Sequence, residues 1–353
     1  MDIADFPDDY ISARERFRQS SAKAGANLEA IPLGGESGLT LDVAILGDPD
    51  PARVLIVSSG LHGVEGPFGS AVQSTWLELA IKNLPARVAI LMLHGLNPYG
   101  FAHVRRFNES NIDLNRNFLL DDQSFEGSPP TYAALDSFLN PKSSPRHFDP
   151  FVIGALAAIA RYGYQPLKQA VAGGQYDFPR GLFFGGHEPA ALQTLLAERL
   201  PAWLGSADPM LHLDYHTGLG KWGTYQLLID HPLSSDQRVW LDRHFANERV
   251  SPFQEESIAY ETRGSIGRWC HSKLIPRSYL YFCAEFGTKP PLAMLAALCA
   301  ENRAQYWGKL ASQPTRQAKQ RLLEAFVPRN RGWREKVVRQ GVALITQALT
   351  ALC

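Results

Sequence analysis

The stretch from Ser58 to Gly69, SSGLHGVEGPFG, places His62 three positions before Glu65 in a glycine-rich turn. It follows the apolar run RVLIV, which is typical of a buried strand. In α/β proteins, functional groups gather where such a strand ends and a helix begins. Because histidine and a carboxylate are common zinc ligands, the pair indicates a metal site whose other members lie elsewhere in the chain.

A third ligand is available at His216, near the end of the apolar run MLHLDYHTG at 210–218. Two histidines and one glutamate would leave one coordination position open for water, as catalytic zinc sites require. Glu285, in FCAEFGT, lies at the end of another apolar run. Its carboxylate could take a proton from that water, so the four residues define a candidate metallohydrolase site.

Short apolar runs predict the strands that must position these residues. They cover residues 41–47, 53–60, 87–95, 210–218, 225–230 and 279–287. Helical patterns alternate with these runs and cover residues 67–83, 188–204 and 234–248. The alternation predicts an α/β fold, a three-layer α/β/α sandwich around a twisted, mixed and mostly parallel sheet.

We predict a single catalytic domain over residues 1–353, because one α/β domain of this length can bury a large core. The segment from about 119 to about 205 begins rich in Pro, Ser and Gly and contains helix-like stretches. It is too long for a bare loop, so we interpret it as an insertion packed on the domain. Apolar spacing after about residue 290 predicts amphipathic C-terminal helices.

The charge balance argues against nucleic-acid and membrane-surface partners. Lys and Arg together number 35, as do Asp and Glu, so the net charge is zero and no basic field would attract a polyanion. No apolar run approaches the roughly 20 residues of a membrane span, and the acidic N-terminus lacks a signal-peptide core. We therefore expect a cytoplasmic enzyme with a small or peptide-sized substrate. The four cysteines lack CxxC spacing and are interpreted as reduced thiols.

The order of the motifs resembles the zinc carboxypeptidases, the M14 metallopeptidases. HGVE at 62–65 is similar to the HxxE of that family, and RRFNESNIDLNRNF at 105–118 is similar to its arginine and asparagine block. Aspartoacylase and succinylglutamate desuccinylase are deacylating relatives of the same fold. The short HGVEG form, together with NPYGF and DLNRNF, looks most like a bacterial branch, the DUF2817 proteins. The resemblance spans about 62–287 and implies a zinc-exopeptidase-like sheet.

The resemblance also implies roles for individual residues. One Zn²⁺ per chain would be held by His62, Glu65 and His216. Glu285 matches the general base, which also returns a proton to the leaving amine. Asp113 would accept a hydrogen bond from His62 and orient that ligand.

Four further positions match substrate-binding or oxyanion groups of the family. Arg106 matches the arginine that polarises the scissile carbonyl, although Arg105 beside it leaves the register open by one residue. Asn115 and Arg116 match the pair that grips the substrate's terminal carboxylate. Tyr260 resembles the tyrosine that covers bound substrate, with spacing around the following Gly-Ser-Ile that differs by one residue on each side.

Together these features predict a zinc-dependent hydrolase that cleaves an amide bond next to a free carboxylate. A metallocarboxypeptidase-type peptidase is the first hypothesis, and an N-acyl amino acid deacylase of the aspartoacylase or desuccinylase type is the alternative. Both substrates place a carboxylate beside the amide. A zinc-containing ligand-binding protein without catalysis is the alternative from another class, but every expected catalytic position is filled. Taken alone, HxxE would be an ordinary solvated turn.

Two residues share a strand face with His216, because side chains alternate along a strand. These are His212 and Asp214. We interpret them as packed strand residues and keep a role as hydrogen-bond partners of a ligand as the alternative.

Overall fold

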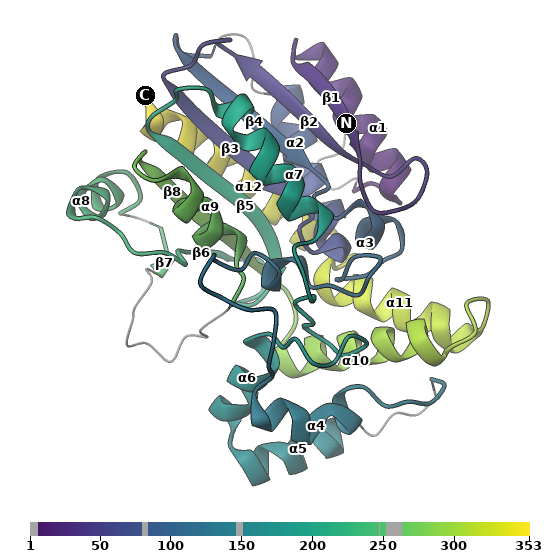
Figure 1. Cartoon of the computed structure of the whole chain (residues 1–353). Coiled ribbons are helices and arrows are strands. Elements are labelled where there is room, and N and C mark those ends of the chain that lie inside the picture. The colour runs from purple at the N-terminus through teal and green to yellow at the C-terminus, as the bar shows by residue number, and fades with distance from the viewer. Residues whose placement is uncertain (1–5, 80–83, 146–150, 247, 252–262) are drawn as a thin grey trace.

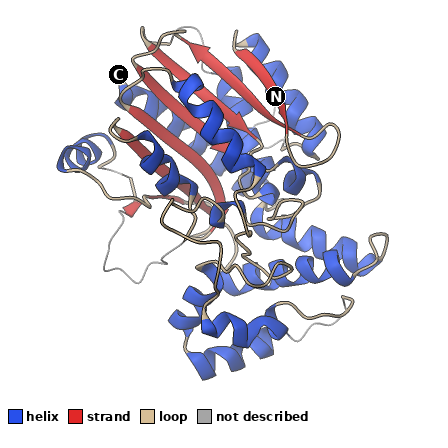
Figure 2. Ribbon diagram, viewed as in Figure 1, coloured by secondary structure: helices blue, strands red, loops and turns tan. Residues whose placement is uncertain are grey.

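The computed structural model describes residues 6–79, 84–145, 151–246, 248–251 and 263–353. In this part of the chain, a sheet lies between two layers of helices, and further helices gather beyond one end of the strands (Figures 1 and 2). The predicted three-layer α/β fold is therefore confirmed.

The strands of the described residues form one eight-stranded sheet in the order β1-β2-β4-β3-β5-β8-β6-β7. They are β1 (Asn27–Pro32), β2 (Thr40–Gly47), β3 (Arg53–Ser59), β4 (Val88–His94), β5 (Met210–Gly218), β6 (Tyr225–Leu228), β7 (Val250–Ser251) and β8 (Tyr279–Gly287). The central strands β4, β3, β5 and β8 are parallel to one another. On one side β2 is antiparallel to β4, and β1 is antiparallel to β2. On the other side β6 is antiparallel to β8, and β7 is parallel to β6. The sheet is therefore mixed, with a parallel centre.

One helical layer contains α2 (Gly66–Leu79) and α12 (Arg331–Leu352), with α1 (Tyr10–Lys23) packed against α2. The other contains α7 (Ala191–Leu204) and α9 (Ile266–Leu274). The remaining helices are α3 (Pro98–Ala102), α4 (Pro130–Leu139), α5 (Phe151–Tyr162), α6 (Tyr164–Ala172), α8 (Ser235–His244), α10 (Pro291–Trp307) and α11 (Gln313–Phe326). Figure 1 shows α4 to α6 and α10 to α11 beyond the lower end of the strands.

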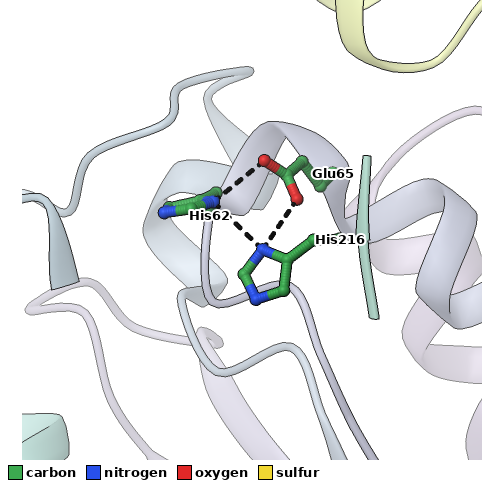
Figure 3. A group of neighbouring side chains, drawn as sticks. All are labelled: His62, Glu65 and His216. Atoms are coloured by element: carbon green, nitrogen blue, oxygen red, sulfur yellow. Dashed lines mark hydrogen bonds and ion pairs between the residues drawn. The ribbon is translucent and has the colours of Figure 1, made fainter. Parts of the chain in front are cut away.

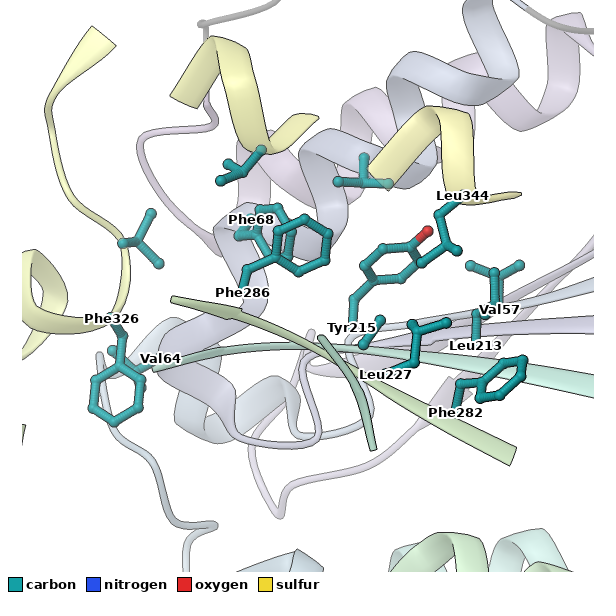
Figure 4. Packing of buried hydrophobic residues seen from close by; sticks show 14 of the residues in the cluster. Val57, Val64, Phe68, Leu213, Tyr215, Leu227, Phe282, Phe286, Phe326 and Leu344 are labelled. Carbon is teal, nitrogen blue, oxygen red and sulfur yellow. The ribbon is translucent and has the colours of Figure 1, made fainter. Parts of the chain in front are cut away.

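Two apolar cores lie on opposite faces of the sheet. The larger core packs β5 and β8 residues such as Leu213, Tyr215 and Phe282 against α2 and α12 (Figure 4). The other core packs Tyr279 and Tyr281 of β8 against α7 and α9. Because side chains alternate along a strand, β5 and β8 each contribute to both cores, and this fixes which residues face each helical layer.

The order of the central strands determines where a site can form. From β3 the chain runs through α2 to β4 on one side, and it later returns to β5 on the other side of β3. This reversal is a topological switch point, where the loops at the carboxyl ends of neighbouring strands diverge and leave room for a ligand. The carboxyl ends of β3, β5 and β8 are therefore the expected place for the chemistry.

Most predicted elements are present, with boundaries that differ by a few residues. The apolar runs at 210–218 and 279–287 coincide with β5 and β8. The sequence patterns did not predict α1, β1, α6 or α9. The segment at about 119–205 contains α4, α5, α6 and α7, and α10 to α12 follow residue 290. No helix in the described ranges has the length and apolarity to cross a membrane.

Candidate metal centre

Three side chains from two strand ends meet at the switch point (Figure 3). His62 follows β3 and precedes a short 3₁₀ turn, Gly63–Glu65, which brings Glu65 back toward it. His216 comes from β5. His62 Nδ1 lies 2.9 Å from Glu65 Oε1, and His216 Nδ1 lies 3.1 Å from Glu65 Oε2. All three side chains are buried, so the three residues form a compact and nearly dry donor set.

The far sides of both imidazole rings face carboxylates. His216 Nε2 lies 2.7 Å from Asp214 Oδ2. His62 Nε2 lies 3.3 Å from Asp113 Oδ1. This distance allows an ion pair, but the angle does not meet the criteria of a hydrogen bond. A carboxylate at Nε2 favours the tautomer with its proton there, which directs the lone pair of Nδ1 toward the other ligands. The two Nδ1 atoms lie 3.2 Å apart.

This arrangement fits a tetrahedral zinc ion. Zinc–nitrogen bonds of about 2.0–2.1 Å give a ligand-to-ligand edge of about 3.3 Å, close to the observed Nδ1 separation. The two Nδ1 atoms and the Glu65 carboxylate converge on one point, where a cation could replace the protons that the imidazole rings share with Glu65. The donor set of two histidines and one glutamate can therefore hold a metal ion.

The electrostatic surroundings keep Glu65 ionised. Burial opposes its charged form, yet His62 and His216 outweigh that penalty and lower its pKa to about 2. Burial likewise opposes ionisation of Asp214, and His216 holds its pKa well below the ordinary value. Both carboxylates are therefore negative at neutral pH. Glu65 is a candidate metal ligand, and Asp214 contacts the candidate ligand His216 on the side away from the metal position.

Glu285 lies beside His216 on the neighbouring strand, where the register pairs their Cα positions. The backbone N–H of Leu219 donates to Glu285 Oε1 at 2.7 Å and fixes that carboxylate. Burial, followed by the charge of Glu65, raises the pKa of Glu285 to about 7. A carboxyl group with a pKa near neutrality can both accept and return a proton, as a general base requires.

The arginine pair separates into two environments. Arg106 Nε donates to Asp113 Oδ2 at 2.8 Å, and its Nη1 lies 3.8 Å from Glu65 Oε1. Arg105 instead turns away and donates through Nε to Glu301 Oε1 at 3.0 Å. Arg106 is therefore the guanidinium beside the candidate metal ligands, and this geometry favours it over Arg105 for an oxyanion role.

Asn115 and Arg116 lie in the turn that follows Asp113. Asn115 Oδ1 accepts from the N–H of Ile266 at 3.1 Å, which joins the turn to the start of α9. Arg116 is buried, and its Nη1 donates to the carbonyl of Asn115 at 2.7 Å. The structure places both residues near Asp113, as the motif order predicted, and their contact with a substrate stays a prediction. Tyr260 lies outside the described residues.

The HxxE turn is locked to the NPYG segment by close backbone contact. A Cβ built on Gly63 would lie 2.1 Å from the carbonyl carbon of Gly100, so position 63 has no room for a side chain. A Cβ built on Gly100 would lie 2.8 Å from the carbonyl of Arg105, so position 100 is closed by the arginine loop instead. Asn97 Nδ2 donates to the carbonyl of Arg106 at 3.2 Å, and Asn97 Oδ1 accepts from Gly100 N–H at 2.8 Å. NPYG therefore supports the turn that carries His62 and the loop that carries Arg106.

Sequence reasoning missed several supporting residues. Asp214 contacts His216 directly, so the structure supports the hydrogen-bond alternative over the packed-residue interpretation. Ser58 Oγ donates to Asp214 Oδ1 at 2.6 Å and lies 2.7 Å from His212 Nε2. The alternation of His212, Asp214 and His216 was the available signal. Phe183 lies under Arg106, with 5.4 Å from the guanidinium carbon to the ring centre. No pattern in the sequence around Phe183 indicates this contact.

Comparison with solved structures identifies the fold class. Carboxypeptidase A from Helicoverpa armigera is 11% identical, with a TM-score of 0.50 over 98% of this chain and 75% of that one. Bovine thrombin-activatable fibrinolysis inhibitor is 12% identical, with a TM-score of 0.48 over 97% of this chain and 99% of that one. Succinylglutamate desuccinylase from Chromobacterium violaceum is 15% identical, with a TM-score of 0.37 over 84% and 74%. The first of these likenesses shows a carboxypeptidase-like α/β fold.

The family follows from the sequence itself. Residues 6–340 match the family described as Protein of unknown function (DUF2817), and the chain belongs to that family. No curated protein matches the sequence. The resemblance to DUF2817 that the motifs indicated is thus confirmed.

Proposed function

We propose that this protein is a zinc-dependent hydrolase that cleaves an amide bond beside a free carboxylate, with C-terminal peptide bonds as its substrates. The observation that carries the proposal is the convergence of His62 Nδ1, His216 Nδ1 and both oxygens of Glu65, flanked by Glu285 and Arg106. A metal-ligand set, a carboxyl group suited to proton transfer and a guanidinium are the parts that metal-assisted amide hydrolysis needs.

One Zn²⁺ held by His62, Glu65 and His216 would supply Lewis acidity to the scissile carbonyl and acidify a water molecule. The protein's own groups complete the reaction. Glu285, fixed by the N–H of Leu219, accepts the proton of the attacking water and delivers it to the leaving amine nitrogen. Because burial already raises the pKa of Glu285, both transfers fall within reach at neutral pH.

Arg106 supplies positive charge where the carbonyl oxygen becomes an oxyanion. Asp113 accepts from Arg106 Nε at 2.8 Å, so the side chain is held before substrate arrives. A donor held in place loses little entropy when charge develops, and such preorganisation accounts for much of the effect of oxyanion stabilisers. Arg116 is proposed to bind the substrate carboxylate, for which a planar guanidinium is suited.

The test is metal content and hydrolysis in wild type and His62→Ala. Both proteins are purified without added metal and assayed on peptides with free C-termini and on N-acyl amino acids. We expect about one zinc per chain in wild type, with peptide hydrolysis, and loss of both in the variant. Cleavage of N-acyl amino acids alone would favour the deacylase alternative. Zinc binding without turnover in either panel would favour a ligand-binding protein, and wild type that binds no zinc after reconstitution would refute the proposal.

A further inference from the structure

Arg105 belongs to a buried ionic cluster that the proposed chemistry does not use. Its side chain is 2% exposed and donates through Nε to Glu301 Oε1 at 3.0 Å and through Nη2 to Asn111 Oδ1 at 2.9 Å. Lys319 Nζ also donates to Glu301 Oε1 and reaches the carbonyl of His103 at 2.9 Å. Because Glu301 lies in α10 and Lys319 in α11, the cluster ties the C-terminal helices to the arginine loop.

The backbone of the arginine loop is in turn joined to the metal-ligand turn. The carbonyl of Arg105 accepts from the N–H of Val64 at 2.8 Å, and the carbonyl of Arg106 accepts from the N–H of Gly63 at 3.3 Å. Both donors lie between the two candidate ligands of the HxxE turn. A shift of the loop would therefore move Arg106 relative to the ligands.

Unusual backbone conformations gather around the same loop. Among the residues that the structure describes, positive φ outside glycine occurs at Arg87, Val104, Asn111 and Phe183. Val104, with φ of 50°, immediately precedes the arginine pair. Asn111 bonds to Arg105, and the ring of Phe183 lies under Arg106. Such conformations persist where surrounding contacts enforce them, and they are concentrated at functional sites.

We propose that Arg105 is a positioning residue that, held by Glu301 and Asn111, fixes the direction in which Arg106 points. The inference rests on the hydrolase function proposed above. A guanidinium on a long side chain stabilises an oxyanion only if its orientation is set beforehand, and a displacement of about 1 Å can cost about 10²-fold in rate. The C-terminal helices thereby contribute to the site although they supply no residue to it.

The test removes the charge of Glu301 in the full-length, zinc-loaded protein. In Glu301→Gln we expect kcat to fall at least about tenfold, with KM and zinc content unchanged. The affinity for a phosphonate peptide, whose tetrahedral anion mimics the oxyanion, should fall by the same factor. The affinity for the released C-terminal amino acid should not change, because its carboxylate is proposed to bind Arg116 and not Arg106.

Asp42→Asn is the matched control. Asp42 is also a buried carboxylate with two cationic partners, Arg14 at 2.9 Å and Arg18 at 3.3 Å, but it lies on β2 beside α1. Its neutralisation removes a buried carboxylate charge of the same kind and should leave kcat of the folded protein unchanged. Equal losses of kcat in both variants, or an unchanged kcat in Glu301→Gln, would overturn the proposal.

Crystal structures of wild type and Glu301→Gln provide a measurement that does not depend on turnover. We expect the Arg106 guanidinium to leave its 2.8 Å contact with Asp113 in the variant. If the contact is unchanged, the positioning role is refuted whether or not the enzyme is active. If Glu301→Gln does not fold, Arg105→Lys keeps the positive charge but lacks the guanidinium donors that contact Glu301 and Asn111 together, and it is judged by the same criteria. Wild type that cleaves nothing refutes the hydrolase proposal alone.

Discussion

Strands β5 and β8 carry different chemistry on their two faces. Toward α9, the side chains of His216, Glu285 and Asp214 are polar and buried. His216 and Asp214 contact each other, and Glu285 lies beside His216 on the neighbouring strand. Toward α2 and α12, Leu213, Phe282 and their neighbours are apolar and fully buried (Figure 4). Because the two sets alternate along the same strands, a shift in register by one residue would exchange them. The apolar face thus fixes the position of the polar face, and substitutions on the two faces should affect different properties.

The largest expected effect comes from the polar face, at Glu285. Glu285→Gln keeps the shape and the contact with Leu219 N–H but removes the group that accepts a proton. We expect kcat to fall by about 10²- to 10⁴-fold, the usual contribution of general acid–base catalysis. Zinc content should stay at the wild-type level, since Glu285 is not proposed as a ligand. Steady-state kinetics and metal analysis check this, and full activity in the variant would exclude Glu285 as the base.

The apolar face should give the opposite result. Phe282 is 0% exposed in the larger core, and Phe282→Ala should lower the free energy of unfolding by about 3–5 kcal/mol through lost burial and a cavity. Urea unfolding measures this loss. Because Phe282 points away from the site, kcat and KM of the folded protein should not change. A large change in kcat without loss of stability would contradict the separation of the two faces.

Substitution of Asp230 tests whether a buried charge near the polar face lowers the stability of the fold. Its Oδ1 has no hydrogen-bond partner, and burial raises its pKa to about 6. A carboxyl group with a raised pKa in the folded state destabilises the fold once it ionises. This penalty is absent below about pH 4, grows between about pH 4 and 6 and is complete above it.

Asp230→Asn should therefore raise the free energy of unfolding by up to about 3 kcal/mol at pH 8. The same substitution should have little effect at about pH 3, where the carboxyl group is mostly protonated in both states. Thermal melts at the two pH values make the measurement. A stabilisation that is the same at both would show that ionisation of Asp230 is not the cause.

The smallest expected effect is on zinc affinity, through Asp214, which contacts the candidate ligand His216. Asp214→Asn removes the negative charge from the partner of His216 Nε2 and keeps the side-chain shape. Loss of such a partner weakens metal affinity by about 10- to 100-fold. Competition with a chelator of known zinc affinity measures the change, with Asp42→Asn as the control. Unchanged zinc affinity would show that Asp214 is only a packed strand residue and does not support the metal ligand.

The main ligands could be predicted from sequence because each lies at or just after the end of a strong apolar run. His62 follows β3, His216 and Glu285 lie near the ends of β5 and β8, and the fold brings the ends of these parallel strands together. The contact between Arg105 and Glu301 had no such signal, since 196 positions separate the two residues. Their pairing depends on how α10 packs, which local patterns do not encode.

Two missed elements show a further limit of local patterns. Strand β1 is an edge strand with a single buried residue, Ile31, so it lacks the apolar run that marks β3 or β5. Helix α1 is rich in polar residues and buries only one side against α2. Both elements form because the sheet and α2 offer them a surface, and tertiary packing outweighs local preference.

The contact between Gly63 and Gly100 has a consequence for recognising related proteins from sequence. Because a Cβ at position 63 would collide with the backbone at position 100, the HxxE turn and the NPYG segment share one steric requirement. A homologue that kept both zinc-binding residue types but carried a larger residue at position 63 would need a different path for the NPYG segment. One with a larger residue at position 100 would need a different path for the arginine loop, whose Arg105 and Phe107 carbonyls lie 2.8 Å from a Cβ built there. A search pattern that requires the two glycines together should therefore distinguish chains with this turn from chance occurrences of HxxE.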